Sequence, residues 1–182
     1  MVGLGSSRVE SNHASFRIRV ATPADLEHTA AIENAADALL IEFLGPGEWH
    51  PAPTGLERTA SPGFILVSSE EAEGTAVGFA HVTEGEGFAH LEQLSVLTAY
   101  ARKGHGRALV DAAKFAAAAR GYKRISLRTF AEVPWNAPFY ATCGFSESEP
   151  VSDFHRRMAK LETTLGMHRF GRRIEMTASL QP

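Results

Sequence analysis

The chain has 182 residues, of which 44% are hydrophobic and 21% charged, and its formal net charge is −3. These values are ordinary for one globular domain with a substantial core, and they exclude the strong positive charge typical of nucleic-acid binding. The single cysteine, Cys143, excludes an intrachain disulfide and fits a reducing compartment. Neither an apolar run of membrane length nor a charged-then-apolar leader is recognisable. We therefore expect a cytoplasmic protein without a membrane span.

The N-terminal half of the chain predicts one helix followed by a run of strands. Residues 1–15 are rich in Gly, Ser and Asn and predict a flexible tail, whereas residues 16–182 predict a single domain. Thr22 precedes Pro23 and Asp25, which is the pattern of a capped helix start. The expected elements are a strand at 16–20, a helix at 23–43, and strands at 64–68, at 76–82 and from 89 onward.

The C-terminal half predicts alternating helices and strands. The expected elements are a helix at 107–120, a strand at 123–129, a short helix within 134–144, a helix at 152–165 and a strand at 172–178. Together the two halves predict a mixed α/β domain whose sheet is mostly antiparallel and flanked by helices.

The segment 90–110 is the most informative part of the sequence. An alternating strand runs into a loop that contains Gly104 and Gly106, and an alanine-rich helix follows. Backbone N–H groups and the positive end of a helix dipole meet at such a junction, which predicts an anion site. Nearby positive charge comes from Arg102, Lys103 and Arg107. A phosphate or pyrophosphate group is the expected ligand.

Three kinds of phosphate site use glycine loops of this type. A P-loop requires Gly-Lys-Ser/Thr after four residues, and this sequence lacks it. A dinucleotide site requires a third glycine, where Leu109 stands, and an acidic residue in the region that Arg128 and Thr129 occupy. A loop for the pyrophosphate of coenzyme A is the third possibility.

Two motifs in order resemble the GNAT family of N-acetyltransferases. The first is Leu94-Ser95-Val96 followed by Arg102-Lys103-Gly104-His105-Gly106-Arg107-Ala108-Leu109, and the second is Phe139-Tyr140 followed by Gly144-Phe145. The resemblance covers residues 16–145. The segment Val133-Pro134-Trp135-Asn136-Ala137-Pro138-Phe139-Tyr140 is similar to a bacterial-type subgroup. The resemblance implies a sheet that is splayed where acyl-CoA enters.

The family resemblance also implies roles for individual residues. Acetyl-CoA would be the cosubstrate, with its pantetheine arm on the backbone of Leu94, Ser95 and Val96. Its pyrophosphate would be held through N–H groups of the loop residues, which are Arg102, Lys103, Gly104, His105, Gly106 and Arg107. Tyr140 matches the tyrosine that resembles a general acid for the departing CoA thiolate. The implied reaction is direct attack by an amine on the thioester, without a metal ion or a covalent acyl-enzyme.

Two residues are candidates for the base that deprotonates the amine. His90 and Glu92 lie two positions apart on one strand, so both side chains project from the same face. Both precede the segment expected to hold pantetheine. Histidine titrates near neutral pH, and burial raises the pKa of a glutamate toward that range. Glu92 is the favoured base and His90 the second candidate.

The sequence departs from the family pattern at two positions. Ala101 stands where the family has Gln or Arg, so one usual polar partner of the phosphates is missing. Val133 stands where the family has Asn, and Asn136 is therefore a different residue. Because Pro138 follows it, Asn136 is favoured as a helix cap over a coenzyme A contact, although it is kept as a cofactor-binding candidate.

Several other side chains allow a functional or a structural interpretation. Trp49, His50 and Trp135 could line an acceptor pocket, although large aromatic side chains more often pack in a core. Glu33 and Glu42 could face an amine, although most helix carboxylates are solvated.

The predicted function is acetyl transfer to the primary amine of a small molecule or peptide. The alternative is a non-catalytic acyl-CoA-binding or sensing domain, and a homodimer through the C-terminal helix and strand is possible.

Overall fold

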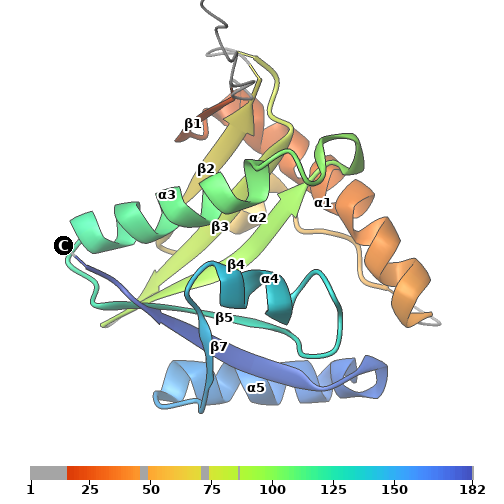
Figure 1. The fold of residues 1–182 in the computed structure, drawn as a ribbon, viewed down its shortest axis with the longest axis vertical. Coiled ribbons are helices and arrows are strands. Elements are labelled where there is room, and N and C mark those ends of the chain that lie inside the picture. The colour runs from red at the N-terminus through yellow and green to blue at the C-terminus, as the bar shows by residue number, and fades with distance from the viewer. Residues whose placement is uncertain (1–15, 46–48, 71–73, 86, 182) are drawn as a thin grey trace, which may run out of the picture.

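The computed structural model describes residues 16–45, 49–70, 74–85 and 87–181, which form a seven-stranded sheet with helices on both faces (Figure 1). In chain order the strands and α-helices are β1 (Arg17–Val20), α1 (Pro23–Leu44), α2 (Gly55–Arg58), β2 (Gly63–Ser69), β3 (Gly78–Gly85), β4 (Phe88–Val96), α3 (His105–Ala119), β5 (Arg124–Phe130), α4 (Ala137–Thr142), β6 (Ser146–Ser148), α5 (Asp153–Thr164) and β7 (Arg173–Ser179). Two short 3-10 helices are η1 (Thr98–Tyr100) and η2 (Met167–Phe170).

The strand order is β1-β2-β3-β4-β5-β7-β6. Five of the strand pairs are antiparallel, and the pair of β4 with β5 is parallel. This arrangement confirms the predicted mixed, mostly antiparallel sheet. The parallel pair is needed because α3 carries the chain from the end of β4 back to the start of β5 (Figure 1).

Alternation along the buried strands divides the core between the two faces of the sheet. On β2, Phe64 and Leu66 join the core cluster that contains Leu109 of α3, whereas Ile65 and Val67 join the cluster that contains Ile32 of α1. Side chains on a strand alternate between faces, so one buried strand supports a helix on each side. Helix α3 therefore covers one face and α1 the other.

The structure differs from the predicted elements in two places. The strand β6 has no counterpart among the elements predicted in chain order, and α3 begins at His105 rather than at residue 107. The helix α2 lies in the proline-rich segment 48–62, for which the sequence predicts a loop with room for one short helix. The strand β6 has only three residues, all polar, and it exists because it pairs with β7. The predicted tail at 1–15 lies outside the described residues. Across the described part of the chain, no helix is both long enough and apolar enough to cross a bilayer.

The predicted start of α1 is confirmed in detail. The Thr22 hydroxyl accepts a hydrogen bond from the Asp25 backbone N–H, and the Asp25 carboxylate accepts one from the Thr22 backbone N–H at 2.7 Å. Arg19 of β1 donates two further hydrogen bonds to the same carboxylate, at 2.5 and 2.9 Å. These hydrogen bonds hold the pKa of Asp25 well below its usual range.

Replacing Asp25 with asparagine is expected to lower the free energy of unfolding at pH 7 by about 2 kcal/mol, because a cap and a mostly buried ion pair are lost together. A carboxyl with a depressed folded-state pKa stabilises the native state above its unfolded pKa, and this contribution disappears as the pH falls toward the folded pKa. The difference in the free energy of unfolding between the wild-type protein and Asp25→Asn should therefore become smaller below about pH 4. Urea unfolding at pH 7 and pH 3 measures both effects.

Asp153→Asn is the matched control, because Asp153 is an exposed first-turn acid of α5 that pairs with Arg156. A surface ion pair contributes little, so its effect should be smaller. If the two variants lost the same free energy of unfolding, the burial of Asp25 beside Arg19 would contribute nothing extra to stability.

Candidate active site

The sheet opens between β4 and β5, as the sequence predicts. Ala89 to Leu91 pair with Ile125 to Leu127, although β4 continues to Val96 and β5 to Phe130. In the described residues the ladder ends at this point, so the β4 backbone beyond Leu91 has no strand beside it on the β5 side. Its N–H and C=O groups are available to an extended ligand that adds to the sheet edge.

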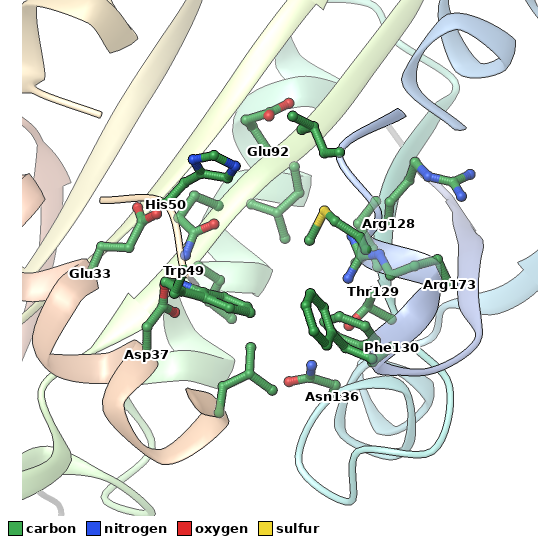
Figure 2. A pocket seen from close by; sticks show the side chains of 18 of the residues that line it. Glu33, Asp37, Trp49, His50, Glu92, Arg128, Thr129, Phe130, Asn136 and Arg173 are labelled. Carbon is green, nitrogen blue, oxygen red and sulfur yellow. The ribbon is translucent and has the colours of Figure 1, made fainter. Parts of the chain in front are cut away.

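A β-bulge lies at the point where the opening begins. Gln93 stands opposite His81, and Leu91 stands opposite Val82, so Glu92 is the extra residue of β4. Bulges reorient side chains and are common beside functional sites. Glu92 is one of the residues that line the opening (Figure 2).

A pocket of about 740 Å³ occupies the opening (Figure 2). Its walls come from α1, the segment after α1, the two diverging strands, the start of α4, and the η2–β7 region. The residues that line it include Glu33, Asp37, Trp49, His50, Glu92, Leu94, Arg128, Phe130, Asn136, Tyr140 and Arg173. A cavity of this size is within the range that binds small-molecule ligands.

Glu92 combines contact with the pocket and a raised pKa. Its side chain is 37% exposed, but the exposed part faces the concave pocket. Burial raises the pKa of Glu92, and the nearby Glu162 carboxylate raises it further, whereas Arg58 and Arg173 lower it. A carboxyl with a raised pKa is a stronger proton acceptor once it is ionised.

His90 is placed differently from the prediction. Its ring is on the same face as Glu92, with 3.8 Å between His90 Nε2 and Glu92 Oε2, but it is only 2% exposed and does not line the pocket. Burial, reinforced by the His155 charge, lowers the pKa of His90 to about 3. His90 therefore does not contact an amine bound in the pocket directly.

The glycine loop places the N-terminus of α3 at the far end of β4. Gly104 is the residue before the helix and has φ = 95°, and Arg102 has φ = 59°, both in the left-handed region. A side chain at residue 104 would be strained in this conformation, so glycine is required there. The first N–H groups of α3 have no acceptor within the helix, which leaves them for an anion.

The side chains of two residues in the predicted phosphate loop are engaged elsewhere. His105 is 2% exposed, with its Nδ1 2.7 Å from Ser68 Oγ and its ring 4.4 Å from that of Phe16. Arg107 donates two hydrogen bonds to Thr142, at 3.0 Å to its carbonyl and 2.6 Å to its hydroxyl. Their backbone N–H groups remain candidates, but their side chains anchor α3 to β2 and α4. Lys103 lies over the Tyr100 ring at 4.8 Å.

Tyr140 lines the pocket opposite the acidic wall of α1. Its ring packs edge-on against Phe139 at 5.2 Å and Phe145 at 5.9 Å. Burial raises the pKa of Tyr140, so the hydroxyl stays protonated at all physiological pH values. A partly buried, protonated phenol at the pocket is suited to donating a proton.

The expected cap by Asn136 is wrong. Asn136 occupies the N-cap position of α4, but its side chain makes no capping hydrogen bond. A capping residue adopts the extended region, whereas Asn136 has φ = −103° and ψ = −99°. The amide lines the pocket instead (Figure 2).

The wall of the pocket formed by α1 and the segment after it contains residues for which the sequence favoured a structural role, and one residue that the sequence did not single out. Trp49, His50 and Glu33 line the pocket, although a structural role was the favoured interpretation of each type. Asp37 was missed, yet it lies four residues after Glu33 on α1 and therefore on the same face. The Trp49 indole N–H donates to the Asp37 carboxylate at 3.1 Å.

The opposite wall is basic but largely neutralised. Arg128 of β5 donates to Glu162 at 2.8 Å, and Arg173 of β7 donates to the same carboxylate at 2.5 Å. On the acidic wall, Arg58 makes a buried ion pair with Glu33. Among the described residues, no group of three His, Cys, Asp or Glu side chains is arranged to hold a metal ion.

A sheet that opens beside a glycine-led helix, with a carboxylate and a phenol in one pocket, is the arrangement expected of an acetyltransferase. The sequence model of the acetyltransferase (GNAT) family matches residues 32–145, which is more than half of the chain. The chain therefore belongs to the acetyltransferase (GNAT) family. This membership confirms the resemblance inferred from the glycine loop and the Phe139-Tyr140 motif.

Solved structures share the fold. The ribosomal-protein-S18-alanine N-acetyltransferase from Escherichia coli superposes with a TM-score of 0.65 at 20% identity, covering 92% of this chain and 95% of that one. Ard1 from Thermoplasma volcanium gives 0.64 at 18% identity, covering 92% and 99%. N-acetylglutamate synthase from Neisseria gonorrhoeae, solved with coenzyme A and N-acetyl-glutamate, gives 0.68 at 18% identity, covering 92% of this chain and 35% of that one.

Proposed function

We propose that this protein transfers the acetyl group of acetyl-CoA to a primary amine by direct attack within a ternary complex. The observation that carries the proposal is the pocket itself. It opens between the splayed strands and presents a carboxylate of raised pKa, Glu92, together with a protonated phenol, Tyr140. One group suits the removal of a proton from an ammonium, and the other suits the protonation of a leaving thiolate.

The acyl-CoA would lie along the unpaired edge of β4 and end at α3. Its pantetheine amides would take the free backbone groups of Leu94–Val96, and its pyrophosphate would meet the N-terminus of α3. N-acetylglutamate synthase, which shares the fold, was solved with coenzyme A, and this supports coenzyme A as the group that the protein binds. Because His105 and Arg107 are anchored elsewhere, the phosphate contacts would come from backbone N–H groups and from Arg102 and Lys103.

The reaction requires three proton transfers before one proton is returned to solvent. Glu92 takes one proton from the substrate ammonium, and the neutral amine attacks the thioester carbonyl to form the C–N bond. The C–S bond then breaks, and Tyr140 donates its proton to the departing sulfur. The phenolate regains a proton from the nitrogen of the new amide. One proton, held on Glu92, is left to return to solvent in each turnover.

An assay of coenzyme A release tests this proposal. The purified protein is given acetyl-CoA with a diamine, a free amino acid or a peptide with a free N-terminus, and the released thiol is measured. We expect turnover with at least one of these amine classes. Tight acetyl-CoA binding with no thiol release for any of them would instead support an acyl-CoA-sensing domain.

Replacing Gly106 with alanine tests the placement of the pyrophosphate. An added Cβ would meet Phe139 only at 3.6 Å, which is ordinary contact, so thermal stability should change little. Because the methyl group stands in the first turn of α3, the KM for acetyl-CoA is expected to rise about tenfold while kcat changes less. An unchanged KM would place the pyrophosphate elsewhere.

Cytoplasmic location and a homodimer are expectations that accompany this proposal. The strand β7 pairs with β5 along its whole length, whereas β6 pairs only with its residues 175–177 on the other edge. A dimer formed by the C-terminal region would therefore use α5, β6 or the ends of β7 that β6 does not cover. Sedimentation of the purified protein distinguishes a monomer from a dimer.

A further inference from the structure

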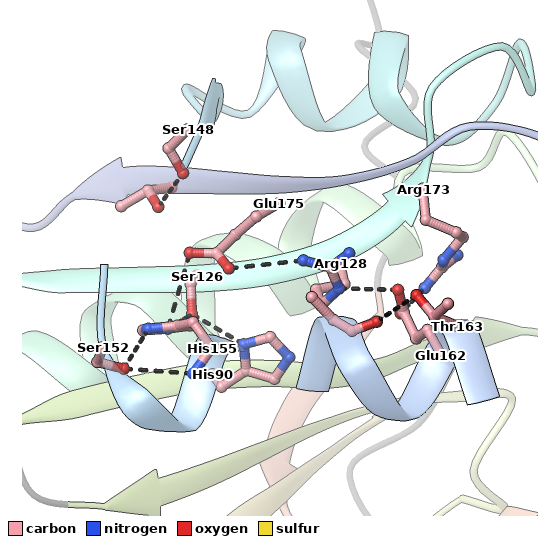
Figure 3. Close-up of polar contacts among 12 residues, drawn as sticks. His90, Ser126, Arg128, Ser148, Ser152, His155, Glu162, Thr163, Arg173 and Glu175 are labelled. Carbon is pink, nitrogen blue, oxygen red and sulfur yellow. Dashed lines mark hydrogen bonds and ion pairs between the residues drawn. The ribbon is translucent and has the colours of Figure 1, made fainter. Parts of the chain in front are cut away.

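A chain of polar side chains runs from Glu92 through the protein to the start of α5. Figure 3 shows its part from His90 to Ser152. Glu92 Oε2 is 3.8 Å from His90 Nε2, and His90 Nδ1 is 2.8 Å from Ser126 Oγ. Ser126 Oγ is in turn 2.9 Å from His155 Nε2, and His155 Nδ1 is 2.6 Å from Ser152 Oγ. Residues from β4, β5 and α5 are thus joined in one line.

The middle of this chain is excluded from solvent. His90, Ser126 and His155 are 2%, 3% and 6% exposed. The rings of Phe88 and Phe154 stack at 4.0 Å, and Phe154 lies 5.4 Å from the ring of His90. Burying three polar side chains among aromatic rings is unfavourable unless each is hydrogen-bonded, as these are.

The two ends of the chain differ from its middle. Glu92 opens into the pocket, and Ser152 is the half-buried N-cap of α5. The chain therefore connects the pocket with the half-buried start of α5.

Both histidines are neutral in this setting. Burial lowers the pKa of His90 and of His155. The charged and titratable groups facing the chain are Arg128 of β5, Arg173 and Glu175 of β7, His81 of β3 and Glu162 of α5. A neutral imidazole has one N–H and one lone pair, so each ring can accept a proton on one nitrogen while it releases one from the other.

We propose that Ser126 and His155 act through His90 as positioning residues that carry the proton from Glu92 to Ser152 and out to water. This inference rests on the proposed function, because it begins with the proton that Glu92 takes from the amine. A filled pocket holds little water, so the route along His90 becomes the available exit for that proton. The 3.8 Å gap at Glu92 must close when substrate binds, as catalytic hydrogen bonds often do.

The transfer balances at every atom. Glu92 gives its proton to His90 Nε2, and the Nδ1 proton of His90 moves to Ser126 Oγ. The original Ser126 hydroxyl proton moves to His155 Nε2, the Nδ1 proton of His155 moves to Ser152, and the proton of Ser152 leaves to water. No residue between Glu92 and Ser152 gains net charge. After the transfer, His90 and His155 hold their protons on Nε2. Once the product has left, the same steps in reverse, from water at Ser152 to Glu92 and the water of the emptied pocket, restore the starting tautomers.

The test compares variants that keep a hydrogen bond with variants that remove one. His155→Gln keeps a side-chain amide that can form a hydrogen bond with Ser126 but cannot pass a proton. Ser126→Ala removes the hydroxyl at the centre of the hydrogen-bonded series. Both are expected to lower kcat about tenfold or more, with the KM for acetyl-CoA unchanged. Ser148→Ala is the matched control, because Ser148 bonds Thr177 at 2.8 Å on β6 and lies outside the chain. Thermal melting of each variant verifies its folding.

A second measurement separates proton transfer from mere support of the fold. His155→Ala leaves a space near the surface, and added imidazole should restore kcat in proportion to its concentration. Full activity of His155→Gln, or loss of activity in His155→Ala without rescue by imidazole, overturns the relay. If the wild-type protein turns over no amine, the proposed function itself fails. Wild-type turnover that depends on Glu92 but not on Ser126 or His155 refutes the relay alone.

Discussion

Replacing Glu92 with glutamine is expected to lower kcat/KM for the amine about a hundredfold or more, because the variant keeps the shape of the side chain but cannot accept a proton. The KM for acetyl-CoA should stay the same, since the carboxylate faces the acceptor part of the pocket. Burial raises the pKa of Glu92. In the wild-type protein, kcat/KM should therefore increase with pH as this carboxyl ionises, and that increase should be absent in the variant. A pH–rate profile measures both.

Glu132→Gln is the matched control for this variant. Glu132 is an exposed carboxylate that pairs with Arg172 and does not line the pocket. Its replacement should leave kcat/KM and the pH profile unchanged. If Glu92→Gln behaved in the same way, another group or water would be the base.

Replacing Tyr140 with phenylalanine is expected to lower kcat about a hundredfold, because the departing thiolate loses its proton donor. The phenylalanine ring keeps the contacts with Phe139 and Phe145, so folding and the KM values should change little. Steady-state kinetics with acetyl-CoA measure the loss. An acetyl donor whose thiol has a lower pKa should reduce it, because a more stable thiolate leaves without assistance.

Tyr122→Phe provides the control for that substitution. Tyr122 is partly buried against the main core cluster and does not line the pocket. An equal loss of kcat in both variants would mean that the hydroxyl of Tyr140 has no special role. Insensitivity to the thiol pKa would argue against proton donation by Tyr140.

Local interactions made much of the fold predictable. Thr22 and Asp25 cap α1 through atoms three residues apart, and Gly45 ends the helix at φ = 59°. The alternation along β2 directs its side chains to two faces, as a strand buried on both sides requires. The strand β6 was not predictable in the same way, because its three polar residues are ordered by β7, about thirty residues away.

Side-chain roles within the site were less predictable than its location. A basic residue beside a glycine loop suggests phosphate binding, but Arg107 bonds Thr142 of α4 instead. Trp49 and His50 come after α1 in the sequence, and no motif there predicts that they line a pocket. They line it because their segment lies across the opening, near Glu33. These outcomes depend on which residues become neighbours, and spacing along the chain does not specify that.

The sequence by itself determined the family resemblance, the order of the strands and helices, the glycine-led helix, and the face that Glu92 shares with His90. Each of these depends on residues within a few positions of one another, through alternation, capping or a local motif. Only the tertiary structure decided that Glu92 opens into a pocket while His90 is buried against Ser126. The reason is the bulge in β4 and the packing of α5 beneath it. The contacts of Ser126 with His90 and with His155 join residues that are 36 and 29 positions apart in the sequence.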